Sequence, residues 1–157
     1  MLGIWHFSFT VSDLDGAVDF YVDGLGGTCV HRQEQDNAYT RSLVGYPDAH
    51  LLVAQIRFGD RAGVSGHDLE LVQYLTPMGH RGDKGIANPG AAHLAFAVED
   101  IDAEYERLTA RGVHFFSAPN RITAGVNTGG AAVYFHGPDD IVHELVEPPP
   151  RRATSRS

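Results

Sequence analysis

The chain has 157 residues, of which 43% are apolar and 20% charged, and its formal net charge is −8. That length suffices for one domain with a substantial core, and the acidic balance with a single lysine, Lys84, excludes a typical nucleic-acid-binding protein, which needs clustered Lys and Arg. No apolar run approaches the roughly 20 residues of a membrane span, and no signal-peptide pattern opens the chain. Cys29 is the one cysteine, so no internal disulfide is possible. We therefore expect a cytoplasmic protein without a membrane partner.

The first half of the chain predicts a strand, a helix and several further strands. Apolar and polar residues alternate over 4–11, so His6, Ser8 and Thr10 share one polar face that is suited to line a cavity. Ser12 or Asp13 caps the helix that follows. The expected elements are a strand over 4–11, a helix from Leu14 to Leu25 and strands over 28–34, 38–44, 51–58 and 68–74.

The second half repeats this order after a segment, 76–90, whose prolines and glycines indicate a linker. Its expected elements are a strand over 93–98, a helix from Ile101 to Leu108 capped by Asp100, and strands over 113–117, 131–136 and 141–146, with a loop after 117 and a turn over 137–140. We expect one domain over 1–148, made of module one (about 4–75), the linker (about 76–90) and module two (about 91–147). The tail 149–157 has no periodicity and is expected to be disordered.

Two sequence motifs recur. The pattern H-x-x-F-x-V-x-D-[L/I]-D begins at His6 and again at His93, and Glu-Leu-Val begins at Glu70 and again at Glu144. Each half thus offers a histidine on its first strand and a glutamate on its last. Alone, each histidine would most simply be a hydrogen-bonded strand residue, and each glutamate an outward-facing side chain on a half-exposed strand. The repetition favours a metal site with two imidazole and two carboxylate ligands.

Such a mixed nitrogen and oxygen ligand set suits one divalent first-row ion: Ni, Co, Zn, Mn or Fe. Four protein ligands on a six-coordinate ion leave two positions for adjacent oxygens of a small substrate. The ion would act as a Lewis acid, and a neighbouring carboxylate could move a proton.

At this point the chain resembles the vicinal-oxygen-chelate superfamily, which includes glyoxalase I, methylmalonyl-CoA epimerase, extradiol dioxygenases and bleomycin-resistance proteins. The resemblance covers about residues 4–147. It is carried by H-x4-V-x-D at 6–13, Phe-Tyr at 20–21 with Leu-Gly at 25–26, L-E-L at 69–71, G-x-x-H-x-A-F-x-V-x-D at 90–100 and P-D-x-x-x-x-E-L at 138–145.

The resemblance implies an α+β fold in which paired βαβββ modules form a cupped mixed sheet around a metal ion. It implies the ligands His6, Glu70, His93 and Glu144, a set similar to that of glyoxalase I. It also implies a homodimer, and the sequence leaves open whether the ligands meet within one chain or across two.

The leading functional hypothesis is a metal-dependent isomerase, epimerase or lyase that moves a proton next to a carbonyl, with Glu144 or Glu70 as the catalytic base and Glu144 preferred by analogy. An alternative is an Fe(II)-dependent oxygenase of the extradiol-dioxygenase type, using His6, His93 and Glu144. Another is a non-catalytic protein that binds an antibiotic or other small molecule. Trp5, Tyr74 and Tyr134 could stack on such a ligand, although core filling is the simpler explanation of these aromatic residues.

Four further residues are weaker candidates for substrate binding. Val133 and Phe135 have the parity of core residues, so Tyr134 and His136 should face the site, and Gln55 and Arg57 are the counterparts in the first half. Two histidines have the wrong strand parity relative to the glutamates, namely His67 and His143. The remaining histidines follow no pattern and are treated as surface residues: His31, His50, His80 and His114.

Overall fold

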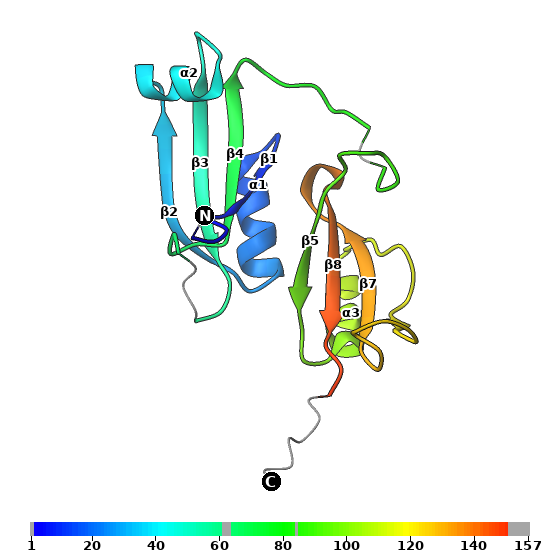
Figure 1. Cartoon of the computed structure of the whole chain (residues 1–157). Helices are drawn as coiled ribbons and strands as arrows, with labels where there is room; N and C mark the ends of the chain where they lie inside the picture. The colour runs from blue at the N-terminus through cyan, green and yellow to red at the C-terminus, as the bar shows by residue number, and fades with distance from the viewer. Residues whose placement is uncertain (1, 61–63, 84, 151–157) are drawn as a thin grey trace. The chain divides into compact units, whose positions relative to one another are not determined.

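The computed structural model describes residues 2–60, 64–83 and 85–150, and its chain divides into two compact units, Met1–Gly82 and Asp83–Ser157. Each unit holds one four-stranded mixed sheet with a helix after its first strand (Figure 1). The α+β class and the repeated βαβββ order are therefore confirmed. No helix within the described residues has the length and apolar character needed to cross a membrane.

The first unit contains β1 (Phe7–Thr10), α1 (Leu14–Asp19), the π-helical turn η1 (Phe20–Gly24), β2 (Thr28–Gln35), α2 (Ala38–Val44), β3 (His50–Arg57) and β4 (Leu69–Thr76). Its strand order is β1-β4-β3-β2. The strand β1 runs parallel to β4, whereas β3 is antiparallel to both β4 and β2. The last strand in sequence thus lies beside the first, which is what brings residue 70 close to residue 6.

The helix α1 starts where the repeated motif predicts it. Asp13 is the N-cap, and its side chain accepts a hydrogen bond from the backbone N–H of Gly16. The helix packs against β3 and β4, where Ala54, Ile56 and Leu69 are fully buried. Because side chains alternate along a strand, the glutamate at position 70 faces the opposite side of the sheet.

The second unit contains β5 (His93–Ala97), α3 (Ile101–Ala110), β6 (Asn120–Arg121), β7 (Ala131–His136), the 3-10 turn η2 (Pro138–Asp140) and β8 (Val142–Glu147). Its strand order, β5-β8-β7-β6, matches the first unit, and β5 again runs parallel to the last strand. Asp100 caps α3 by accepting from the N–H of Ala103 at 3.0 Å. The buried face of this unit includes Phe135 and Leu145.

The strand predicted over 38–44 is wrong, because this segment forms the helix α2. The side chain of Asn37 accepts a hydrogen bond from the backbone N–H of Thr40 at 2.9 Å, which caps the first turn. Gly45 ends the helix with a left-handed conformation at φ 77°. The two caps favour a helix in this segment. A strand would gain little here, because the apolar side chains of Tyr39 and Leu43 are exposed and form no buried face.

The strand predicted over 113–117 is reduced to an isolated bridge between Phe115 and Phe135. Two backbone hydrogen bonds flank it, from Phe116 to Tyr134 and from His136 to His114. The short strand β6 then takes the edge position, within the segment that was expected to be a loop. Most of the tail expected to be disordered, residues 151–157, lies outside the described residues, as does Lys84.

Candidate metal centre

His6, the residue just before β1, meets Glu70 of the parallel neighbouring strand β4 in the first unit. The strand register places Ser8 opposite Glu70, so His6 lies two residues before the position that faces the glutamate. Its Nε2 atom is 3.7 Å from Oε1 of Glu70, and the side chains are 27% and 21% exposed, respectively. The pair is therefore partly shielded but open to a ligand from solvent.

His93 and Glu144 repeat this relationship in the second unit. Ala95 is opposite Glu144 in the register of β5 and β8, so His93 again lies two residues before the facing position. Its Nε2 atom is 3.4 Å from Oε2 of Glu144. The same ring nitrogen therefore faces a carboxylate in both units, at the same offset along equivalent strands.

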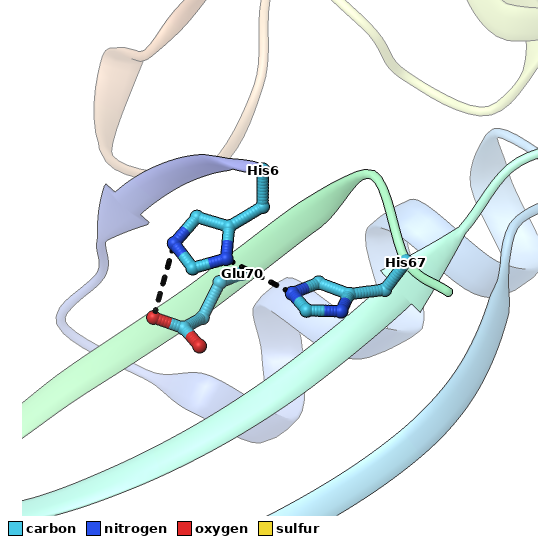
Figure 2. Close-up of side chains that lie close together, drawn as sticks. All are labelled: His6, His67 and Glu70. Atoms are coloured by element: carbon cyan, nitrogen blue, oxygen red, sulfur yellow. Dashed lines mark hydrogen bonds and ion pairs between the residues drawn. The ribbon is translucent and has the colours of Figure 1, made fainter. Parts of the chain in front are cut away.

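The structure adds one histidine that sequence reasoning set aside. His67 is buried, with 4% of its surface exposed, and its Nε2 atom is 3.1 Å from Nδ1 of His6. Figure 2 shows His6 between its two partners, with one ring nitrogen toward each. His67, His6 and Glu70 can offer ligand atoms that all lie within 4.8 Å of one another.

Strand parity failed for His67 because the strand β4 begins only at Leu69. The alternation of side chains does not extend into the preceding loop, where the backbone turns His67 toward His6. The sequence offered only the closeness of His67 to the Glu-Leu-Val motif, and no periodicity could have selected it.

Tyr134 lies beside the pair in the second unit, as its parity predicts. It is opposite Glu144 in the register of β7 and β8, and its ring packs edge-on against His93 with 5.2 Å between centroids. Burial raises the pKa of the Tyr134 phenol, and the negative charge of Glu144 raises it further. The phenol therefore remains a hydrogen-bond donor at neutral pH.

The other three substrate-binding candidates occupy related positions. Gln55 lies opposite Glu70 in the register of β3 and β4, so it is the counterpart of Tyr134. Arg57 lies two residues further along β3, on the same face. The ring of His136 packs against Phe116, with 4.6 Å between centroids. The structure therefore places Gln55 and Tyr134 directly opposite the two glutamates, and Arg57 and His136 two residues further along the same strands.

His143 faces the core rather than the site, in agreement with its parity. It is fully buried, and its ring packs against Phe96 and Phe135. Burial lowers its pKa to about 4, which outweighs the opposite effect of a hydrogen bond with the backbone of Leu94. The imidazole is therefore neutral at physiological pH and serves packing.

Comparison with known families agrees with the motifs and the fold. Residues 3–145 match the Glyoxalase/Bleomycin resistance protein/Dioxygenase superfamily. The chain belongs to this superfamily. The resemblance that the repeated His and Glu motifs predicted is thereby confirmed.

Among relatives in this superfamily, a 2-epi-5-epi-valiolone epimerase from Actinomyces sp. is 34% identical over 152 residues, which are 94% of this chain and 80% of the relative. A lactoylglutathione lyase from Arabidopsis thaliana is 21% identical over 144 residues, and the chain spans only 43% of its length. These relatives are enzymes.

Solved structures of superfamily members share the fold. A glyoxalase family protein from Bacillus cereus has a TM-score of 0.78 at 23% identity, with 96% of each chain covered. The glyoxalase I of Leishmania major has a TM-score of 0.65 at 18% identity, with 92% of this chain and 86% of that chain covered. At these identities the comparison establishes the architecture alone.

Members of this superfamily bind a divalent metal ion, and the donor atoms of each unit, taken by itself, are of a kind that such an ion accepts. Each unit offers an imidazole nitrogen next to a carboxylate oxygen, and neither unit contributes a thiolate to its pair. Imidazole and carboxylate together suit Zn, Mn, Fe, Co or Ni. These four side chains are partly exposed, at between 19% and 43%, so solvent reaches both pairs.

Proposed function

We propose that this chain is a divalent-metal-dependent epimerase or related isomerase that moves a proton on a carbon next to a carbonyl. The observation that carries the proposal is the repeated pairing of a histidine Nε2 with a glutamate, at the same strand offset in both units. The 34% identity to an epimerase of the same superfamily supports proton transfer over other chemistry.

In this proposal His6, Glu70, His93 and Glu144 hold the metal, which is Ni, Co, Zn, Mn or Fe. When bound, the ion supplies a Lewis acid that polarises the substrate carbonyl. The substrate is a small molecule with two adjacent oxygens, of the kind that a hydroxyketone presents. The name of the Actinomyces relative makes 2-epi-5-epi-valiolone the first compound to test.

The two glutamates are the proposed acid and base. Glu144 removes the proton from the carbon beside the carbonyl and holds it on a carboxylate oxygen. Glu70 returns a proton, and an inversion of configuration results if the two carboxylates act on opposite faces of that carbon. Tyr134 supports the first step, because its protonated phenol beside Glu144 can donate a hydrogen bond to a substrate oxygen.

Neighbouring residues would position the substrate. The Gln55 amide, opposite Glu70, can donate to a hydroxyl group or accept from one. Arg57 and His136 lie two residues further along their strands, where they can contact a more distant part of the substrate. The Gln55, Arg57 and His136 side chains offer several hydrogen-bonding groups, which suits a polyhydroxylated substrate.

Proton exchange with solvent tests the function directly. We expect metal-loaded protein in deuterium oxide to convert 2-epi-5-epi-valiolone to an epimer that carries one deuterium at the inverted carbon. The variant Glu144→Gln should keep its metal and lose turnover. The control Glu106→Gln, a change on the exposed surface of α3, should keep both the metal and the turnover. Full activity of Glu144→Gln with metal bound would show that Glu144 is not the base.

A further inference from the structure

His67 lies in a segment that is fixed against His6 on both sides. The hydroxyl of Ser65 is 2.6 Å from the backbone carbonyl of Trp5, and the backbone N–H of Phe7 donates to the carbonyl of Asp68 at 2.9 Å. These contacts join the residues that flank His6 to the residues that flank His67. The loop before β4 is therefore held so that the two rings meet, with 5.1 Å between their centroids.

The two nitrogens of His6 have different neighbours. Nδ1 is 3.1 Å from Nε2 of His67, while Nε2 is 3.7 Å from Oε1 of Glu70 (Figure 2). The lone pairs of one imidazole point away from each other, so one ion can take only one of them. A metal ion at Nε2 leaves Nδ1 to hydrogen-bond with His67, whereas a metal ion at Nδ1 would lie on the side of the ring away from Glu70.

The second unit decides between these possibilities. There the glutamate again faces Nε2 of the histidine, His93, at 3.4 Å. The position three residues before Glu144 is Ile141, which is buried and has no ligand atom. The ligand pair shared by the two units is thus histidine Nε2 with glutamate, and His67 is an addition to the first unit.

We infer that His67 is a positioning residue that fixes the tautomer and ring orientation of His6 for metal binding through Nε2. This inference rests on the proposed function. When Nε2 of His6 serves as a ligand, its ring proton lies on Nδ1 and is donated to the unprotonated Nε2 of His67. A ligating histidine usually donates its second N–H to such an acceptor, and loss of that acceptor typically costs 10- to 100-fold in metal affinity.

Nuclear magnetic resonance of the full-length protein can observe this arrangement. The probe is cadmium-113 bound to protein with nitrogen-15-labelled histidine, in which a ligating nitrogen couples to the metal. We expect coupling at Nε2 of His6, a proton on its Nδ1, and no coupling at His67. Coupling at His67 would make it a direct ligand and would overturn the inference while leaving the proposed metal site intact.

Substitution provides a second, independent test. We expect His67→Phe to weaken Zn²⁺ affinity, measured by calorimetry, by about 10- to 100-fold, and His67→Gln, which keeps an acceptor, to recover most of that loss. The control His31→Phe changes an exposed histidine on β2 and should bind as the wild type does. Wild-type affinity in His67→Phe would overturn the inference alone. Absence of a stoichiometric ion in the wild-type protein would contradict the proposed function and this inference together.

Discussion

Tyr134 lies directly across from Glu144 on neighbouring antiparallel strands, and its ring also packs edge-on against His93. The Tyr134 side chain therefore lies beside both proposed metal ligands of the second unit, His93 and Glu144. In the first unit the corresponding position opposite the glutamate is Gln55. The two units thus share a histidine–glutamate pair and differ in the residue opposite the glutamate, which is an aromatic phenol in one unit and an amide in the other.

Removal of the Tyr134 hydroxyl should reduce catalysis without removing the metal. The raised pKa of Tyr134 keeps its phenol protonated, so the phenol O–H can donate a hydrogen bond to a substrate oxygen. We expect Tyr134→Phe to lower kcat/KM roughly tenfold, or about 1.4 kcal/mol of transition-state stabilisation, in steady-state assays. Tyr105→Phe, which changes a tyrosine packed on Phe115, is the matched control. An unchanged kcat/KM in Tyr134→Phe would remove this tyrosine from the mechanism.

His143 should make the stability of the protein depend on pH. Its pKa is about 4 in the folded state and about 6.5 in an unfolded chain, so the unfolded state binds more protons between these values. The free energy of unfolding is therefore unaffected by this residue above pH 6.5 and decreases as the pH falls toward 4. The expected loss between pH 7 and pH 4.5 is about 2–3 kcal/mol.

Urea unfolding of metal-free protein measures this contribution. The variant His143→Phe keeps an aromatic ring against Phe96 and Phe135 but cannot be protonated. We expect its free energy of unfolding to decline less steeply with acid than that of the wild type. Parallel pH profiles for the two proteins would show that His143 is not the buried titrating group.

The helix α2 should depend on its N-cap. Asn37 accepts hydrogen bonds from both the backbone N–H and the hydroxyl of Thr40, and the exposed apolar residues of the helix contribute little packing. We expect Asn37→Ala to lower the free energy of unfolding by about 1 kcal/mol, as measured by denaturant titration. Ser42→Ala, in the exposed part of the same helix, should not destabilise the protein.

Gly27 is required by close packing at the end of the first helix. A Cβ atom there would lie 2.7 Å from Cγ2 of Ile56 and 2.9 Å from the carbonyl oxygen of Tyr21, and the second of these atoms belongs to the backbone. We expect Gly27→Ala to destabilise the protein by roughly 2–3 kcal/mol. At Gly26 an added Cβ atom would meet open space. We therefore expect Gly26→Ala to lower the free energy of unfolding by only about 1 kcal/mol, because alanine disfavours the left-handed φ of 76°. Equal melting temperatures for the two variants would contradict this packing.

The fold and the two neighbouring histidine–glutamate pairs followed from the repeated motif because that motif specifies strand parity and a helix cap together. Alternation placed His6 on a polar face and Glu70 on the face opposite Leu69 and Leu71, and Asp13 and Asp100 capped the helices as predicted. Register then decided which residues met, since in each unit the first strand pairs with the last. The repeat can be seen in the sequence, whereas the parallel pairing of the first and last strands brings the histidine and the glutamate of each unit together.

Periodicity could not predict features that depend on local capping or on loops. The segment 38–44 has apolar residues at spacings that fit either a strand or a helix, and the caps at Asn37 and Gly45 decided for the helix. His67 precedes its strand, so its direction follows from contacts of Ser65 and Asp68 that link positions some 60 residues apart. Such long-range contacts leave no periodic signal in one sequence.

The metal content of the purified protein tests most directly whether each unit contributes a histidine–glutamate pair to metal binding. Elemental mass spectrometry after removal of loosely bound ions should find one stoichiometric divalent ion, from the group Ni, Co, Zn, Mn and Fe. We expect His6→Ala and His93→Ala each to lose it, while His31→Ala retains it. No bound metal after incubation with each ion, or full metal content in both pair variants, would contradict the account.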